Sequence, residues 1–512
     1  MKKTLLYFIF LSTIPSLTAA PFCPDSLYSK WAIDSRMGDF RNKTSTEGFL
    51  TSTTPANATW DYVSGLVAKA ILKAWEQYKD QSWSQYYFIG IQHFADNQTM
   101  TLGESNIDDL NAGKIFFELY RGALGKGETT KASTYKNNAT TCRNRLKYNH
   151  QRIDSNLPGA GGFWHKKQYT NQMWLDGLYM GAALYAEWQG NFGTEQGETD
   201  NLQSWNDIAL QFDTVFAHTW DSNKKLNYHA WSAEPSNAAS SYWANVSTGR
   251  SQEFWGRGVG WFFAALVDVL EYMPEQLSAR NRLISYANQV AEGLSERQDE
   301  NSGCWYQLLQ YDNTKKGISC NINNYLESSA SCMFTYAYLK GIRLGILDKN
   351  IYTDVAEKAY KGLIENFVVE ENNKKIKLIQ SCESAGLSGT RKGDANYYLC
   401  GSDVKINSDT EGKVLGPFIM ASLEYELAKK STAIATTKKE KLHCNVKKKE
   451  KSIEIVSAEK NIQKVSIIDT AGLILQNWVG APTDMVDMDM LNYGRGIYFI
   501  RVNDQKIKYF YH

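Results

Sequence analysis

Apolar residues recur at helical spacing through most of the chain. Between residues 60 and 430, stripes with an i, i+3/i+4 period and longer apolar runs follow one another. The stripes and runs are Val63–Ala74, Met173–Trp188, Trp205–Thr219, Gly260–Tyr272, Ser328–Leu344, Val355–Phe367 and Pro417–Lys429. Loops rich in Gly, Asn, Ser and Thr separate them. This alternation predicts a mainly α fold, a toroid of paired helices whose long loops build a cleft at one end.

The pattern changes after residue 430. Residues 431–443 are polar and rich in lysine, which is typical of a linker. Residues 444–512 then alternate with period two, as in Ile453/Ile455 and Ile497/Phe499, and predict a small all-β, sandwich-like module. The phrases at 467–472 and 496–502 resemble the C-terminal sorting domains of the type IX secretion route. An accessory β-module without a sorting role is the alternative.

The N-terminus has the pattern of a secretory signal peptide. Lys2 and Lys3 precede an apolar stretch, Leu5–Leu17, and small residues follow at Thr18–Ala20. Residues 1–20 are therefore expected to be removed, leaving 21–430 as the helical domain of a protein in the periplasm, at the cell surface or outside the cell. No later segment offers the uninterrupted apolar length that a membrane span requires, so no membrane insertion is expected.

Composition narrows the possible partners. The net charge is +1, which argues against nucleic acid, since phosphate binding requires a surplus of Lys and Arg. Aromatic residues make up 13% of the chain, a composition seen in carbohydrate-active enzymes, whose flat rings stack on sugars. The oligomeric state is left open.

The eight cysteines show neither a C-x-x-C motif nor zinc spacing, so no metal is expected. In an exported protein, short-range pairs such as Cys304–Cys320 and Cys382–Cys400 could join long loops, although the sequence leaves the connectivity open. Cys332 lies in an apolar helical run and is expected to be a buried free thiol.

Asp176 stands between Trp174 and Tyr179 at the start of an apolar run. Loss of water there is expected to raise its pKa and let it keep a proton near neutrality, as a general acid must. The alternative is a helix N-cap, a common role for Asp before a helical run.

Three further polar residues, Asp108, Arg257 and His229, are candidate site residues. Asp108 precedes a helix and is again a cap by default. Arg257 lies between two glycines, suits a planar carboxylate, and projects on the same face as Trp261 one turn later. A buried salt bridge is the alternative there. His229 could donate to a sugar oxygen, but a single histidine is more often structural.

Taken together, these segments resemble glycoside hydrolase families 105 and 88, the unsaturated rhamnogalacturonyl and glycuronyl hydrolases. The matching phrases are FWHKKQYTNQMWLDGLYMG (163–181), FWGRGVGWFFAALVDVLEYMP (254–274) and YLESSASCMFTYAYLKGIRLGILD (325–348), with NIDDLNAGK (106–114) and GPFIMASLEYE (416–426) extending them. The resemblance covers about residues 50 to 430. Val259 departs from it, because an Asn is expected between the glycines.

The resemblance implies an (α/α)6 barrel and removal of the 4,5-unsaturated uronic acid that a lyase leaves at the non-reducing end of an oligosaccharide. In those families an acid protonates C4, water adds at C5, and the resulting hemiketal opens without any cofactor. By this resemblance Asp176 is the general acid/base, and Asp108 is the second carboxylate. His229, Arg257, Trp261, Trp174, Trp164 and His165 are the implied substrate-binding residues, with Arg257 or His229 facing the uronate carboxylate.

Several alternatives stay open at this stage. The sugar after the uronate is expected to be rhamnose of pectin-type rhamnogalacturonan, but ulvan and glycosaminoglycan fragments remain candidates. The same barrel could also carry a polysaccharide lyase or an ordinary inverting hydrolase. A sugar-binding protein that has lost its chemistry is the third possibility.

Overall fold

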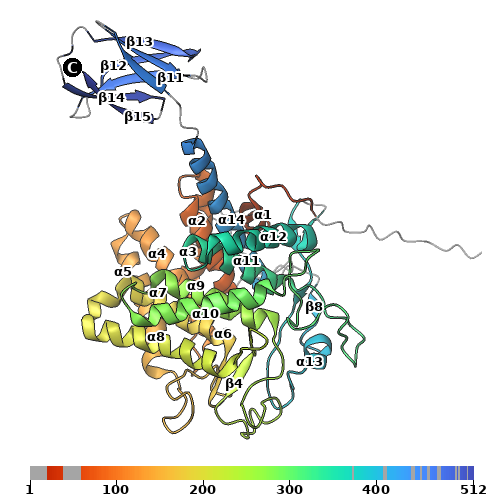
Figure 1. The fold of residues 1–512 in the computed structure, drawn as a ribbon. Coiled ribbons are helices and arrows are strands. Elements are labelled where there is room, and N and C mark those ends of the chain that lie inside the picture. Colours follow the sequence, from red (N-terminus) through yellow and green to blue (C-terminus); the bar gives the residue numbers. More distant parts are fainter. Residues whose placement is uncertain are drawn as a thin grey trace, which may run out of the picture. The chain divides into compact units, whose positions relative to one another are not determined.

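The chain folds into two compact units, Met1–Ala428 and Lys429–His512 (Figure 1). The computed structural model describes residues 20–37, 59–371, 374–407, 412–439, 444–449, 452–457, 462–469, 474–490, 493, 496–503 and 505–511. The expected signal peptide, residues 1–20, lies outside this described part except for its last residue.

The first unit is built mainly from helices, as the periodicity predicts. They are α1 (Tyr28–Asp34), α2 (Tyr62–Gln77), η2 (Ser82–Ser84), α3 (Gln85–Asn97), η3 (Asp108–Lys114), α4 (Ile115–Gly125), α5 (Thr129–Asn149), α6 (Leu175–Gly177), η4 (Leu178–Ala182), α7 (Ala183–Phe192), η5 (Gly193–Gln196), α8 (Glu198–Thr219), α9 (Gly256–Tyr272), α10 (Ser278–Ser295), α11 (Ser328–Arg343), α12 (Lys349–Phe367), α13 (Ala395–Cys400) and α14 (Gly412–Lys439).

Inner and outer helices alternate along the chain, which makes this unit an α/α barrel. Helices α9 and α11 are buried on nearly every side and contact each other, so they belong to the inner layer. Helix α5 instead buries one face, at Ala132, Tyr135, Ala139, Cys142 and Leu146, and packs on α4. A single apolar stripe is the pattern of a helix that covers a core from outside.

Short two-stranded sheets connect the helices at one end of the barrel. Their strands are β1 (Gln172–Trp174), β2 (Trp220–Asp221), β3 (Leu226–Asn227), β4 (Ala230–Ser232), β5 (Val368–Glu370), β6 (Ile376–Leu378), β7 (Ser381–Cys382) and β8 (Ile406–Asn407). The antiparallel pairs are β1–β4, β2–β3, β5–β6 and β7–β8. The β1–β4 pair matters most here, because it places the segments before Asp176 and after His229 side by side.

The second unit is the expected β-module. Its strands are β9 (Cys444–Lys448), β10 (Ser452–Ser457), β11 (Ile462–Ile468), β12 (Ile474–Thr483), β13 (Met485–Asp489), β14 (Gly496–Val502) and β15 (Gln505–Tyr511). They form a sheet of order β13-β10-β9 and another of order β12-β11-β14-β15. One apolar cluster takes Ile453 from the first sheet and Val465 and Ile500 from the second, so the two sheets share a core.

Most of the expected linker, residues 431–443, is part of helix α14. This helix runs from Gly412 to Lys439 and so includes most of residues 431–443. The reason lies in the composition, since residues 431–439 contain no Gly or Pro and include two Ala and two Lys, which favour helix.

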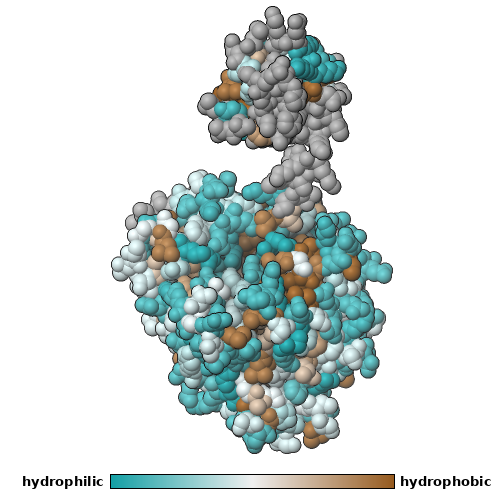
Figure 2. Space-filling view, turned by 60° about the vertical axis from the view of Figure 1, so that its left-hand side comes forward, coloured by the Kyte–Doolittle hydropathy of each residue, from teal (hydrophilic) through white to brown (hydrophobic). Residues whose placement is uncertain are grey.

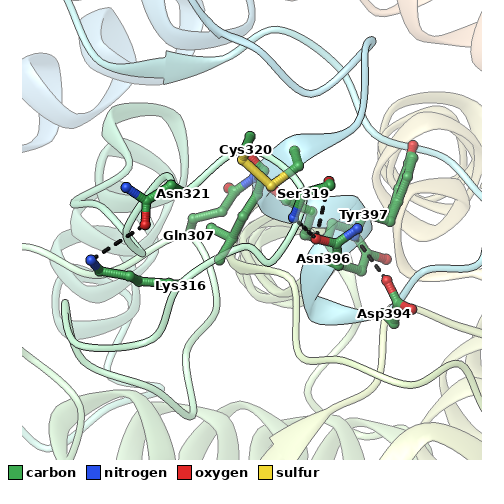
Figure 3. Close-up of a disulfide and its surroundings, with 11 residues drawn as sticks. Gln307, Lys316, Ser319, Cys320, Asn321, Asp394, Asn396 and Tyr397 are labelled. Carbon is green, nitrogen blue, oxygen red and sulfur yellow. Dashed lines mark hydrogen bonds between the residues drawn. A yellow bond between two sulfur atoms is a disulfide. The ribbon is translucent and has the colours of Figure 1, made fainter.

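The disulfide also differs from the pairs suggested by sequence spacing. Cys320 bonds to Cys400 across 80 residues, whereas Cys304 and Cys382 are buried free thiols (Figure 3). Cys332 is a buried free thiol, as expected. Distant loops meet at this point, because Ser319 donates to the side chain of Asn396 at 2.9 Å. The disulfide therefore fixes the end of α13 to the loop after residue 310.

On the face of the helical unit that Figure 2 shows, most side chains are hydrophilic, and apolar side chains form several groups among them. Within the described residues, no helix combines the length and the apolar character that crossing a membrane would require.

The contact between α2 and η3 offers a test of the packing. A Cβ at Gly65 would overlap the backbone of Ala112 in η3, whereas nothing lies within 4 Å of a Cβ at Gly125, the last residue of α4. We expect Gly65→Ala to lower the free energy of unfolding by about 1–3 kcal/mol, since overpacking forces backbone shifts. Gly125→Ala is the matched control and should be neutral or slightly stabilising. Equal thermal stability of both variants would contradict this packing.

Candidate active site

A cavity of about 240 Å³ opens where the inner helices begin. Tyr62 is the first residue of α2, Asp108 the first of η3, and Arg257 the second of α9. Its lining residues are Tyr62, Asp108, His165, Lys166, Tyr169, Trp174, Asp176, Met180, Trp255, Arg257, Trp261, Ser384, Ala385, Gly386 and Arg391. Helix N-termini carry partial positive charge, so the position favours an anionic ligand.

Strand pairing brings Asp176 to His229. Trp174 pairs with Ala230 in the β1–β4 ladder, and the amide of Leu175 donates to the carbonyl of His229 at 3.0 Å. The chain then turns into α6 and directly into the π-helical turn η4. Such turns are frequent at functional sites, because they redirect side chains within a helix. Asp176 thus projects into the cavity beside His229.

A chain of three side chains runs inward from the cavity. His229 Nε2 lies 3.1 Å from Asp176 Oδ2, and its Nδ1 lies 2.7 Å from the hydroxyl of Tyr398. His229 and Tyr398 are completely buried. The tyrosine hydroxyl can donate to Nδ1 or accept from it, so either neutral tautomer of His229 can face Asp176. The arrangement accommodates both an ionised and a protonated carboxyl group.

The pKa of Asp176 departs from the sequence expectation. Burial raises it, as anticipated, but the electrostatic interaction and the hydrogen bond with His229 outweigh burial. The net result is a pKa below the ordinary range of an aspartate. In the absence of substrate, Asp176 is therefore ionised at neutral pH, and the prediction that it holds a proton there was wrong for the free protein.

Asp108 also lines the cavity, where it contacts the side chains of Lys166 and His165. The ammonium group of Lys166 lies 2.6 Å from Asp108 Oδ2, and His165 Nε2 lies 3.6 Å from Oδ1. Burial lowers the pKa of Lys166, but the Asp108 carboxylate more than compensates, so the pKa is raised and the lysine stays charged. The N-cap position of η3 is held by Ile107, and Asp108 lies inside the first turn, which argues against the capping alternative.

Aromatic rings form one side of the cavity. The rings of His165 and Trp174 stack with centroids 4.6 Å apart, and Tyr169 stacks on Trp174 at 4.7 Å. Burial lowers the pKa of His165 to about 4, so its ring is neutral. Stacked flat surfaces of this kind suit the apolar face of a sugar.

Arg257 and Trp261 reach the same cavity from α9. Arg257 Nη1 donates to the carbonyl of Cys382 at 2.6 Å, which anchors the loop after β7 to the helix. No carboxylate lies within 4 Å of its guanidinium in the described structure, so the buried salt bridge considered above is not what holds it. Trp261 packs on Tyr179 with ring centroids 4.7 Å apart.

Two predicted residues lie elsewhere. Trp164 is not a lining residue, and its indole donates to Asn171 at 2.9 Å. His229 does not line the cavity either, since it is completely buried, and both of its ring nitrogens have protein partners, Asp176 and Tyr398. This placement suits a residue that positions Asp176, and its predicted contact with the substrate carboxylate stays a prediction.

Three residues in or beside the cavity have no local signal in the sequence: Lys166, Arg391 and Tyr398. Lys166 stands within the first matching phrase, but an adjacent lysine and the absence of a periodic pattern gave no reason to select it. Arg391 and Tyr398 come from a segment with no helical stripe. Long-range contacts bring this segment to the barrel, among them the Cys320–Cys400 disulfide and the hydrogen bond from Gln307 to the carbonyl of Tyr398.

The described residues contain no group of three or more His, Cys, Asp or Glu side chains that could hold a metal ion. An α/α barrel with two carboxylates, stacked aromatic rings and cationic side chains around one cavity defines a carbohydrate-active enzyme.

The comparison with known proteins gives the family. The chain belongs to Glycosyl Hydrolase Family 88, whose family model matches residues 30–429, and it is therefore a glycosidase. A solved structure of a family 105 glycoside hydrolase from C. acetobutylicum ATCC 824 is 34% identical, with a TM-score of 0.63 over 78% of this chain and 100% of that one.

Two further relatives extend the comparison. Protein Atu3128 of Agrobacterium fabrum is 32% identical over 241 residues, which are 46% of this chain and 96% of that protein. An unsaturated 3S-rhamnoglycuronyl hydrolase of Alteromonas sp. is 32% identical over 111 residues, which are 22% of this chain and 24% of that protein. The unsaturated glucuronyl hydrolase of Bacillus sp. GL1 shares the fold, with a TM-score of 0.50 at 13% identity.

Removing the Tyr398 hydroxyl tests whether the chain of contacts from Tyr398 through His229 to Asp176 supports the reaction. We expect Tyr398→Phe to lower kcat by about 10- to 100-fold, the loss typical when the partner that orients a functional histidine is removed. KM should change little, because Tyr398 does not line the cavity. Tyr352→Phe is the control, since Tyr352 packs on Tyr338 outside the cavity. A Tyr398→Phe enzyme with normal kcat would show that this chain of contacts does not support the reaction.

A substitution at His229 tests the cause of the pKa shift. In His229→Asn, the amide can still meet Tyr398 but no longer reaches Asp176. The lowering by His229 disappears while burial continues to raise the pKa, so the pKa of Asp176 should rise. The carboxyl stretch in pH-dependent infrared difference spectra measures this, with Asp176→Asn identifying the band. A pKa that stays put or falls would contradict the assignment.

Proposed function

We propose that this enzyme removes a 4,5-unsaturated uronic acid from the non-reducing end of lyase-generated oligosaccharides by hydrating its double bond. The observation that carries the proposal is the placement of Asp176 and Asp108 in one cavity that also presents Lys166, Arg257 and Arg391. A uronate carries a carboxylate, and this cavity offers cations and helix N-termini to receive it.

Asp176 acts as general acid and base in this reaction. Entry of a carboxylate-bearing substrate displaces water and brings a second negative charge, and both effects raise the pKa of Asp176. The carboxyl group, protonated from solvent, then delivers a proton to C4. The ionised Asp176 next removes a proton from the water that adds at C5, and the hemiketal opens to release the neighbouring sugar.

Asp108 holds ring hydroxyls and orients the water. Its carboxylate is held in place by Lys166, whose ammonium group lies 2.6 Å away. Trp174 and Trp261 present flat surfaces to the sugar, and His165 extends the stack as a neutral ring. Arg257 offers its guanidinium to the uronate carboxylate from the start of α9.

The sugar that follows the uronate is proposed to be rhamnose, with pectin-type rhamnogalacturonan as first choice. Two relatives support rhamnose, since both are named unsaturated 3S-rhamnoglycuronyl hydrolases. Ulvan fragments are the second candidate, because the same two names specify a rhamnose modified at position 3.

Export is also proposed. The disulfide Cys320–Cys400 supports it, because such bonds persist in oxidising compartments. The charged and apolar N-terminal pattern supports it as well, although residues 1–19 lie outside the described part. Whether the β-module acts as a sorting signal stays a prediction.

The reaction can be followed by ultraviolet absorbance, since hydration destroys the conjugated double bond that a lyase would create. We expect decay with unsaturated rhamnogalacturonan disaccharide and little with chondroitin-derived disaccharide. Asp176→Asn should lower the rate by at least about 100-fold, and Asp108→Asn should also impair it severely. Binding of the disaccharide by Asp176→Asn, measured by calorimetry, is the control for an intact cavity.

Each outcome decides a separate point. Decay with ulvan fragments alone would move the substrate to ulvan. An absorbance increase on intact polysaccharide would replace the hydrolase with a lyase. Binding without any decay would leave a sugar-binding protein, and normal turnover by Asp176→Asn would refute its role as the acid.

A further inference from the structure

A second cavity lies at the other end of the barrel. Its volume is about 300 Å³, somewhat more than the cavity that holds Asp176, and within the range that takes small organic ligands. Residues from the last turns of inner helices line it, among them Gln77 of α2, Tyr272 of α9 and Arg343 of α11. Lys114 joins them from the point where η3 continues into α4. The two cavities therefore lie at opposite ends of the same helices.

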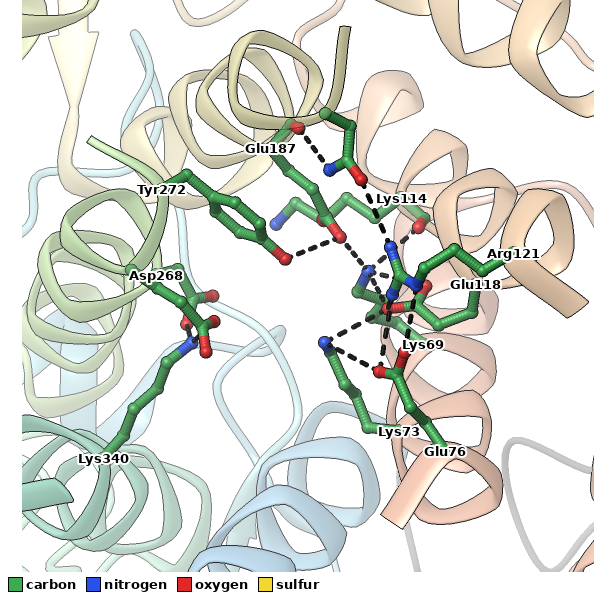
Figure 4. A network of polar contacts seen from close by, with 12 residues as sticks. Lys69, Lys73, Glu76, Lys114, Glu118, Arg121, Glu187, Asp268, Tyr272 and Lys340 are labelled. Atoms are coloured by element: carbon green, nitrogen blue, oxygen red, sulfur yellow. Dashed lines mark hydrogen bonds and ion pairs between the residues drawn. The ribbon is translucent and has the colours of Figure 1, made fainter. Parts of the chain in front are cut away.

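Most charges around this second cavity are paired (Figure 4). Lys69 meets Glu187 at 2.7 Å, Lys340 meets Asp268 at 2.7 Å, and Arg343 meets Glu424 at 2.6 Å. Each of these three carboxylates thus contacts a cation, and Lys69 and Lys340 also contact a second carboxylate each, Glu118 and Glu271. An ion-pair network that is complete in this way needs no ligand.

Lys114 is the exception. Its side chain is buried, with 3% of the residue exposed, yet its ammonium group has one hydrogen bond, to the carbonyl of Tyr179 at 2.6 Å. It also lies 3.6 Å above the ring of Tyr179. No carboxylate in the described chain comes within 4 Å of it, and an ammonium group has three protons to donate. A buried charge without a counter-ion is costly, so the site is incomplete by itself.

The direction of Lys114 and its neighbour shows where the missing group belongs. In Figure 4 the ammonium groups of Lys114 and Lys73 point toward the space between the Lys69–Glu118 group and Lys340. Lys73 has long contacts only, 3.4 Å to Glu76 and 3.3 Å to Glu118. It is about one-third exposed, so it stands where solvent reaches the cavity. Two ammonium groups with free donors thus face one space.

Hydrogen-bond acceptors face the same space. Asp268 is bonded through Oδ1 to Tyr336 and Lys340, and Glu187 through Oε1 to Lys69 and Tyr272. The second oxygen of each carboxylate remains available for hydroxyl donors. Burial lowers the pKa of Lys114 to about 7, so an arriving anion would restore its full charge.

We propose that this cavity is a second binding site for a monosaccharide acid, with the ligand carboxylate on Lys114 and its hydroxyls on Asp268 and Glu187. A singly charged carboxylate satisfies Lys114, whereas phosphate or sulfate would carry more charge toward the surrounding carboxylates. A neutral sugar would leave Lys114 without its counter-ion. The site does not depend on turnover, so it stands or falls separately from the proposed reaction.

Trace labelling of lysines with deuterated acetic anhydride at pH 7.5 tests this site in the intact enzyme. Peptide mass spectrometry gives the labelling rate of Lys114 and of Lys361, an exposed control. Galacturonate at ten times its Kd should slow labelling of Lys114 by about tenfold and leave Lys361 unchanged. Galactose at the same concentration should protect neither lysine.

Three results would overturn the proposal. They are no labelling of Lys114 in the free enzyme, which would mean a closed cavity; no protection by galacturonate; and equal protection by galactose, which would show that the carboxylate is not recognised. Calorimetry gives a second test. Lys114→Met should bind one galacturonate fewer per chain than the wild type, while Lys361→Met should bind the same number. Equal binding by all three proteins would also contradict the site.

Discussion

The contact between Asp176 and His229 is the constraint on which the rest of the active site depends. A carboxylate held at the mouth of an apolar, aromatic cavity would tend to stay protonated, because burial disfavours its charge. His229 reverses this in the free enzyme, and Tyr398 holds His229 in place from behind. The β1–β4 pair, the Cys320–Cys400 disulfide and helix α13 all serve to bring these three side chains together.

Because the inner helices share one direction, different side chains surround the cavities at the two ends of the barrel. Their N-terminal ends surround Asp108, Asp176 and Arg257, and their C-terminal ends surround a network of lysines and carboxylates. Cations are stabilised near helix C-termini, which favours Lys340 and Arg343 in the last turn of α11. Helix η3 contributes to both cavities, since Asp108 at its start lines the first and Lys114, where it continues into α4, lines the second.

Sequence periodicity was sufficient for the helices and for the β-module, because each element has a regular buried face. Family resemblance located Asp176, Asp108, Arg257 and Trp261, all of which line one cavity. Contacts between segments far apart in the chain could not be predicted from local sequence patterns. The disulfide partner of Cys400 and the role of Tyr398 depend on a loop closure that no local pattern records, and the sign of the Asp176 pKa shift depends on a partner 53 residues away.

Carrying out the reaction in D2O and examining the released sugar by NMR tests the central claim most directly. If Asp176 protonates C4 of an unsaturated uronate, the product must carry one solvent-derived deuteron at C4. In water enriched in oxygen-18, the label must appear at C5. A released uronate that still contains its double bond, with no deuterium on carbon, would contradict hydration and would assign an ordinary hydrolytic mechanism to the barrel.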